Sequence, residues 1–213
     1  RAKNSEQKHK KFEHLFRYFH MPVVAPLITA FALATLSMSM MEATLVLYMK
    51  DKFNWDIKEV SFGFAYIGII IVFTQGFLVR RLIPKLGERN VLRIGLVLLG
   101  CGLIGIGFSS TIPMMGVVMT LLSLGHGLTN PSFLGSVSLL VPSEEQGLAL
   151  GTTQSLSALG RVFGPMIAGL LFEKLSMSSP FIAGGLFTAL AFVMIISIYS
   201  KLPTSGQKTT SLG

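Results

Sequence analysis

Six long apolar runs divide the chain, and they constrain its fold more than any other feature of the sequence. A helix that crosses the hydrocarbon core of a bilayer needs about 20 mostly apolar residues, and each run supplies that length. The sequence therefore predicts an all-α membrane protein, a bundle of six transmembrane helices. The expected ranges are 22–49, 58–82, 91–110, 113–141, 145–172 and 180–200.

Short polar segments separate the runs, and they hold residues that end or restart a helix. Residues 50–58 place charges around Trp55, an aromatic residue typical of the membrane interface. In residues 142–146, Ser143 is placed to be an N-cap and Gln146 to be its capping-box partner. We therefore expect the fifth helix to begin at this point.

The charge composition indicates lipid rather than nucleic acid as the surroundings of the chain. Only 13% of the 213 residues are charged, whereas soluble domains carry about a quarter. The net charge of +8 comes from basic residues gathered between the apolar runs. Basic residues in such loops set membrane topology, so we expect no nucleic-acid partner.

The distribution of basic residues predicts the orientation of the six spans. Both termini and the even-numbered loops hold most of the Lys and Arg residues, and basic loops stay in the cytoplasm. We therefore expect both termini to be cytoplasmic in an integral multi-pass protein, in a bacterial inner membrane. The odd-numbered loops hold only Lys50, Lys52, Lys58 and Lys174.

The composition divides the chain into three parts. Residues 1–20 are basic, with aromatic and aliphatic residues at helical spacing, which indicates either an amphipathic helix on the cytoplasmic leaflet or a solvated linker. Residues 21–202 form the six-helix transmembrane part, and residues 203–213 are expected to be a disordered cytoplasmic tail. The first residue is Arg rather than Met, so we expect the sequence to begin partway along a longer gene product.

Signatures of soluble enzymes are weak in this sequence. Residues 100–105 match G-x-G-x-x-G, but they lie inside an apolar run, where helix packing explains the glycines better than nucleotide binding does. The histidines have no carboxylate or cysteine at ligand spacing, so we expect no metal. No nucleophile signature is visible. We predict a protein without a cofactor that is not an enzyme.

Two ionisable residues inside the apolar runs are the most informative candidates for function. Glu42 lies in the first span, where a carboxyl can take up and release a proton near neutral pH. Its alternatives are a structural hydrogen bond or a shallow position that water reaches. Arg161 lies near the middle of the fifth span and needs a partner: Glu42, a carboxylate elsewhere, or substrate. Alternatively, Arg161 makes a fixed contact between helices or at a gate.

The fourth span carries polar residues beside a helix-bending proline. His126 and Asn130 are four residues apart and share a helix face, and Pro131 frees a backbone carbonyl. Broken polar helices at membrane depth mark binding sites in transporters. A packing kink is the alternative. Gln75 and Gln154 are weaker candidates of the same kind.

Small residues spaced four apart on the fifth span favour close packing against another helix. They form two stripes, Gly147 with Gly151 and Gly160 with Gly164 and Ala168.

Several short motifs together resemble a known family of carriers. The segments 41–44 and 75–76, the basic loop that ends at residues 87–89, and the segment 154–165 of the fifth span are similar to the second half of the tetracycline-efflux-like and multidrug-efflux-like carriers of the major facilitator superfamily. The resemblance covers residues 20–200, nearly the whole chain.

The resemblance implies a twelve-helix carrier built of two six-helix halves, of which this chain is the second. The first and fourth spans would face the central cavity, the second and fifth would meet the N-terminal half, and the third and sixth would be peripheral. The loop 76–89 is similar to the superfamily's cytoplasmic loop motif. Arg80 stands where that motif commonly has an acidic residue, so the gating salt bridge of the family is not expected in its usual form.

On this basis each candidate residue receives an expected role. Glu42 would carry the proton, and Arg161, Arg80 and Arg89 would form gate or ion-pair contacts. Methionines adapt to varied ligands, which suits a broad substrate range. The substrate cavity would be lined by Met38, Met41, His126, Asn130 and Gln154.

The preferred hypothesis is proton-coupled efflux of amphipathic small molecules or drugs by antiport and alternating access. Its partners would be the lipid bilayer, the N-terminal half of the same transporter, the substrate and protons. Two alternatives remain: a six-helix membrane scaffold that transports nothing, and a carrier for sugars or metabolites.

Overall fold

A computed structural model describes residues 21–202. The predictions for residues 1–20 and 203–213, a surface helix or linker and a disordered tail, lie outside the described residues. Within 21–202, six helices are long and apolar enough to cross a membrane, as the sequence predicts.

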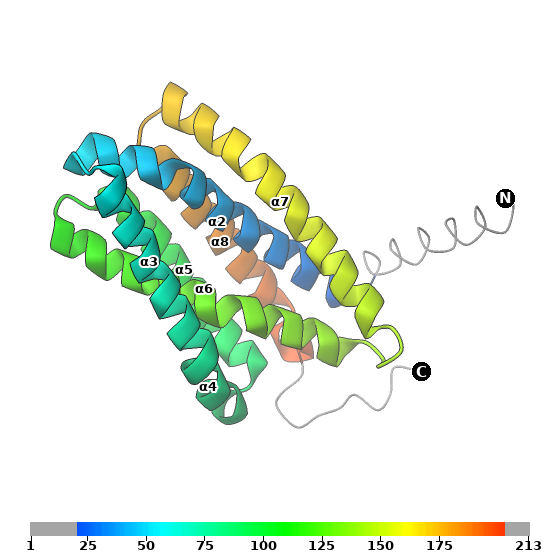
Figure 1. Ribbon diagram of the computed structural model, residues 1–213. Helices are drawn as coiled ribbons and strands as arrows, with labels where there is room; N and C mark the ends of the chain where they lie inside the picture. The colour runs from blue at the N-terminus through cyan, green and yellow to red at the C-terminus, as the bar shows by residue number, and fades with distance from the viewer. Residues whose placement is uncertain (1–20, 203–213) are drawn as a thin grey trace, which may run out of the picture.

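The helices run up and down through the bundle in chain order (Figure 1). The second span is one continuous rod in which a π-helical segment, η1, joins α3 to α4. The last span ends in a short 3₁₀ turn, η2. The bounds are α2 Val24–Phe53, α3 Ile57–Phe73, η1 Thr74–Leu78, α4 Val79–Leu86, α5 Glu88–Phe108, α6 Ile112–Leu140, α7 Gln146–Lys174, α8 Ser179–Ser197 and η2 Tyr199–Lys201.

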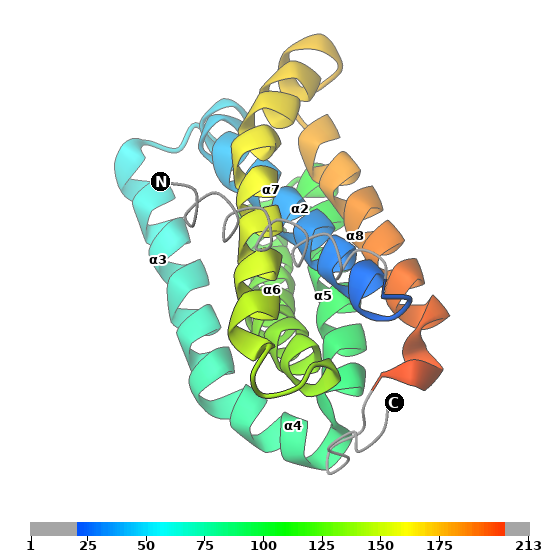
Figure 2. The same cartoon turned by 90° about the vertical axis from the view of Figure 1, so that its right-hand side faces the viewer.

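The bundle has a packed centre and two sparsely covered helices. Helix α2 lies between α7 and α8, and α5 packs along both α6 and α8 (Figure 2). The α3–α4 rod contacts the others mainly through α6. The spans differ in the buried share of an 18-residue apolar stretch. Only 17% of this stretch is buried in the rod and in α7, whereas 61% is buried in α2. The half therefore leaves one face of α7 and most of the α3–α4 rod uncovered.

Two helix ends differ from the sequence-based predictions. The capping box predicted at Ser143 is wrong: α7 begins at Gln146, whose Nε2 donates to the Ser138 carbonyl at 3.0 Å. The Ser143 hydroxyl instead donates to Glu144 Oε1, also at 3.0 Å. A capping box forms instead at the start of α3, where the backbone N–H of Asp56 donates to Glu59 Oε2 at 2.8 Å.

Several glycines of the apolar runs are packing positions, among them those of residues 100–105. A Cβ added at Gly102 would lie 2.5 Å from the Leu122 backbone N of α6, so α5 and α6 can touch only because the side chain is missing. A Cβ added at Gly164 of α7 would likewise lie 2.8 Å from the Ser39 Cβ of α2. Gly147 has nothing within 4 Å, and neither does Gly151, so this stripe makes no packing contact within the described residues.

Candidate functional site

Polar residues on the uncovered face of the half define the candidate site. An ionisable side chain in the hydrocarbon region is costly, so it normally faces water, a partner or another helix. Glu42 of α2 and Arg161 of α7 are both exposed on this half. Gln154, two helical turns before Arg161 on α7, is exposed as well.

Glu42 lies in the C-terminal half of helix α2. It precedes Phe53, the end of α2, by eleven residues, about 16 Å along the axis. The neighbouring Met41 and Thr44 are buried, so the helix turns Glu42 away from the core. The carboxyl thus belongs to the open side of α2 and not to the interior of the half.

Arg161 occupies a similar depth on the adjacent helix. It precedes Lys174, the end of α7, by thirteen residues, about 20 Å along the axis. Its backbone carbonyl accepts a hydrogen bond from the Ser39 hydroxyl of α2 at 3.3 Å, which fixes the two helices against each other. Its positive charge acts on the Glu42 carboxyl. No hydrogen bond or ion pair joins the two side chains among residues 21–202, so they interact through space.

Gln154 and Ser157 lie on the same helix as Arg161. The Ser157 hydroxyl is buried and contacts both the backbone carbonyl and the side-chain Oε1 of Gln154, at 3.0 and 3.3 Å. The amide nitrogen of Gln154 makes no hydrogen bond within the described part of the chain. Gln154 therefore presents a free donor on the exposed face of α7.

His126 and Asn130 lie half-buried on α6. His126 is fourteen residues from each end of the helix and so sits at mid-membrane depth. Helix α6 runs continuously from Ile112 to Leu140, with Pro131 inside it. Close packing holds the helix there: a Cβ at Gly127 would lie 2.8 Å from Thr74 of η1, and Gly125 touches Leu99 of α5.

The two methionines predicted to line the cavity take a different place. Met38 is 4% exposed and Met41 only 1%, and both belong to the hydrophobic core of the half. In this conformation they fill interhelical space and do not reach the uncovered face. The hydrophobic period of the sequence does not reveal which side of α2 is buried, because α2 is apolar around most of its circumference.

Arg80 and Arg89 lie at the opposite end of the bundle, around the turn from α4 to α5. Arg80 is exposed on α4. The guanidinium groups of Arg89 and Arg93 each lie 4.5 Å from the centre of the Tyr199 ring. The sequence analysis missed Tyr199, although an aromatic residue at the end of the last span is a signal of an interfacial contact. Neither Arg80 nor Arg89 has an acidic partner among residues 21–202.

Among residues 21–202, no group of three or more His, Cys, Asp or Glu side chains is arranged to hold a metal ion. Cys101 is a free, exposed thiol on α5.

Comparison with known proteins decides the family. The sequence profile of the Major Facilitator Superfamily matches residues 27–212. The chain belongs to the Major Facilitator Superfamily. This superfamily consists of membrane transporters, and the six-helix bundle is the fold of one of its halves.

Curated relatives within the superfamily carry names that refer to drug resistance. Multidrug resistance protein 2 of Bacillus subtilis is 28% identical over 201 residues, which is 92% of this chain and 47% of that protein. The class E tetracycline resistance protein of Escherichia coli is 31% identical over 128 residues, 60% of this chain and 31% of that protein. The chain thus spans less than half the length of these relatives.

Solved superfamily structures share the fold. The human organic anion transporter MFSD10 (TETRAN) superposes with a TM-score of 0.75 at 24% identity, covering 80% of this chain and 40% of that one. A peptide transporter (POT) in complex with sulfate gives 0.71 at 19% identity, covering 83% and 37%. At these identities the likeness establishes architecture, and substrate has to be argued from the site.

Proposed function

We propose that this chain is the second half of a secondary active transporter that exports amphipathic small molecules in exchange for protons. The observation that carries the proposal is the pair formed by Glu42 and Arg161 on adjacent helices, both on the uncovered side of the half. Residues 21–202 form the transport half, and the N-terminal half of the same protein faces the exposed sides of α3 and α7 across the transport path.

The pair links protonation to the arrangement of the helices. An ionised Glu42 is attracted by the Arg161 guanidinium, and a neutral Glu42 is not, because the attraction requires both charges. Taking up a proton therefore loosens the electrostatic attraction between α2 and α7. A carrier that alternates between two conformations can use this difference to favour one of them.

The uncovered face also suits an amphipathic substrate. Gln154 offers an amide donor, and Val162, Phe163 and Met166 of α7 supply exposed apolar surface. The names of the curated relatives, which refer to tetracycline and multidrug resistance, support drugs as the substrate class. The excess of basic residues in the even-numbered loops supports cytoplasmic termini in a bacterial inner membrane.

The test is drug accumulation in bacterial cells that produce the complete gene product. Glu42→Gln removes the proton site and keeps the size of the side chain, so we expect it to abolish energy-dependent export. Glu173→Gln removes an exposed carboxyl at the end of the same helix pair and should leave export intact. Export by Glu42→Gln at the normal rate would contradict the proposal. A protein that exports no drug but accumulates sugars would favour the sugar or metabolite carrier. A protein that transports nothing would favour the membrane scaffold.

A further inference from the structure

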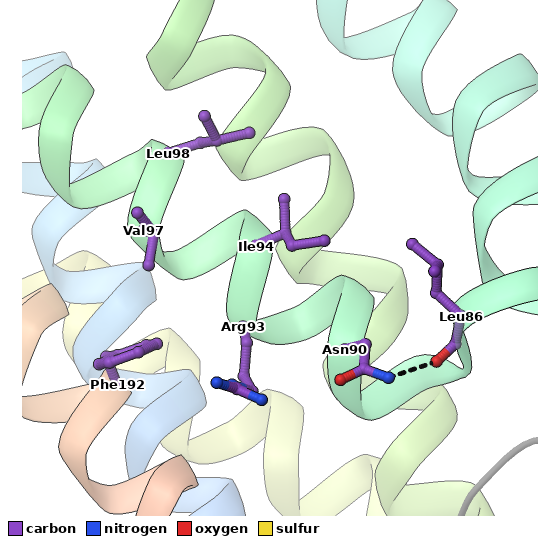
Figure 3. A pocket seen from close by; sticks show the side chains of 7 residues that line it. All are labelled: Leu86, Asn90, Arg93, Ile94, Val97, Leu98 and Phe192. Atoms are coloured by element: carbon purple, nitrogen blue, oxygen red, sulfur yellow. Dashed lines mark hydrogen bonds between the residues drawn. The ribbon is translucent and has the colours of Figure 1, made fainter.

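A pocket opens on the outer side of the bundle, away from Glu42 and Arg161. Its volume is about 440 Å³, and it lies where the end of α4, the first turns of α5 and the last turns of α8 meet (Figure 3). Its walls are apolar, with Asn90 and Arg93 at one end. It is lined by Leu86, Asn90, Arg93, Ile94, Val97, Leu98 and Phe192.

The pocket lies on an apolar face of the bundle, apart from Glu42 and Arg161. Ile94 and Val97 are 42% and 48% exposed, and the exposed large residues of the adjoining α8 face are apolar as well, among them Leu190 and Val193. The uncovered face of α7, in contrast, carries Arg161 and Gln154. An outer face with this composition matches acyl chains as its solvent.

The polar end of the pocket carries positive charge that no acidic side chain neutralises. The Nε atoms of Arg89 and Arg93 are buried without a hydrogen-bond partner. Both guanidinium groups lie 4.5 Å from the Tyr199 ring centre, which holds them in place. Tyr199 is itself fixed, because its hydroxyl donates to Asn90 Oδ1 at 2.7 Å.

The carboxylate of Glu88, the first residue of α5, does not line the pocket, and its Oε2 is buried without a hydrogen-bond partner. A Cβ added to Gly135 of α6 would lie 3.4 Å from Glu88 Cγ, so the Glu88 side chain lies against α6 and does not line the pocket. Asn90 cannot neutralise charge, and its amide donates to the Leu86 carbonyl at 2.7 Å. Arg93 is thus the one charged side chain among the pocket residues.

We propose that this pocket binds an anionic phospholipid of the leaflet next to the basic end of the bundle. The phosphate of the headgroup pairs with Arg93, supported by Arg89, and an acyl chain lies along Ile94, Val97 and Phe192. A guanidinium matches a phosphate by two parallel N–H···O bonds, and Arg93 is the guanidinium that lines the pocket. Basic pockets between helices at this membrane level suit anionic headgroups.

Charge and shape together favour a lipid over a free anion. A free phosphate would use the arginines but would leave the apolar walls without an occupant. A neutral lipid would fill the walls but would leave the arginines unpaired. An anionic phospholipid satisfies both, and it reaches the site by diffusing within the bilayer.

Native mass spectrometry of the purified full-length protein tests the proposal by titration with phosphatidylglycerol, phosphatidylcholine or inorganic phosphate. A direct hydrogen bond between a guanidinium and a phosphate is stronger than the general attraction of a basic residue to an anionic surface. We therefore expect Arg93→Gln to weaken phosphatidylglycerol binding at least about tenfold. Val97→Trp, which fills the apolar part and keeps all charges, should weaken it as well. Arg81→Gln is the matched control, because it removes a charge at the same end and its guanidinium lies over Phe77, outside the pocket.

The outcomes separate the possible occupants. Equal loss in Arg93→Gln and Arg81→Gln would mean general attraction to an anionic surface and would overturn the proposal. Equal affinity for phosphatidylcholine would overturn it too. Competition by inorganic phosphate, with no effect of Val97→Trp, would identify a free-anion site instead. Arg93→Lys, which keeps the charge, should retain more binding than Arg93→Gln and shows that a loss is not a folding defect.

Discussion

At the scale of single residues, the proposed mechanism depends on Arg161 and Glu42. A charged side chain at the centre of a membrane helix costs about 2.5–3.5 kcal/mol on insertion scales, so an exposed Arg161 on an isolated half requires compensation. Glu42 supplies opposite charge from the adjacent helix without a direct bond. Such a loose pair can separate and re-form, as a proton-controlled contact requires.

The coupling of the two residues predicts non-additive loss of transport. Glu42→Gln and Arg161→Gln should each reduce export at least about tenfold, and the double variant should be no worse than the poorer single one, because the two residues act as a unit. Export rates of the three variants in inverted membrane vesicles give the measurement. Losses that multiply in the double variant would show that the two residues act independently.

At the scale of helices, close contacts through glycine hold α5 and α6 together. We expect Gly102→Ala to destabilise the half by about 1–3 kcal/mol, since the new methyl group would overlap the Leu122 backbone, which cannot move aside easily. Gly68→Ala is the matched control: nothing lies within 4 Å of its added Cβ, and alanine favours a helix. Thermal unfolding in detergent measures both. Equal stability of the two variants would contradict the packing account.

The helices themselves could be predicted from sequence, and much of the site could not. The six spans follow from a length requirement that any bilayer imposes. The π-helical η1 begins at Thr74, which packs against Gly127 of α6, and sequence spacing does not reveal this contact. Met38 is buried because its side of the largely apolar helix α2 packs against other helices, and the sequence does not show which side this is. Glu42 and Arg161 could be found because charge in an apolar run is conspicuous.

Contacts between distant segments were the least predictable part of the structure. Arg93 and Tyr199 are separated by nearly the whole of the last four spans, and only the folded bundle brings α5 and η2 together. The capping box at Ser143 failed for a related reason, because Gln146 is drawn to the Ser138 carbonyl at the end of α6.

At the scale of the whole molecule, the uncovered face of α7 predicts a water-accessible path. In a Cys101→Ser background, Gln154→Cys and Ala158→Cys of the complete protein should react with a water-soluble thiol reagent, because they lie on the face with Arg161. Val193→Cys, on the apolar face of α8, is the control and should react slowly. Uniformly slow reaction at all three positions would mean that the α7 face is sealed by protein or lipid.

Proton movement driven by substrate tests the central claim most directly. Proteoliposomes that contain the complete protein are loaded with drug and a pH-sensitive dye, with no initial pH gradient. Outward flow of drug should carry protons inward, so we expect the lumen to acidify, and Glu42→Gln should abolish the acidification. A lumen that stays at its initial pH while drug leaves, or that becomes alkaline, would contradict proton antiport by this protein.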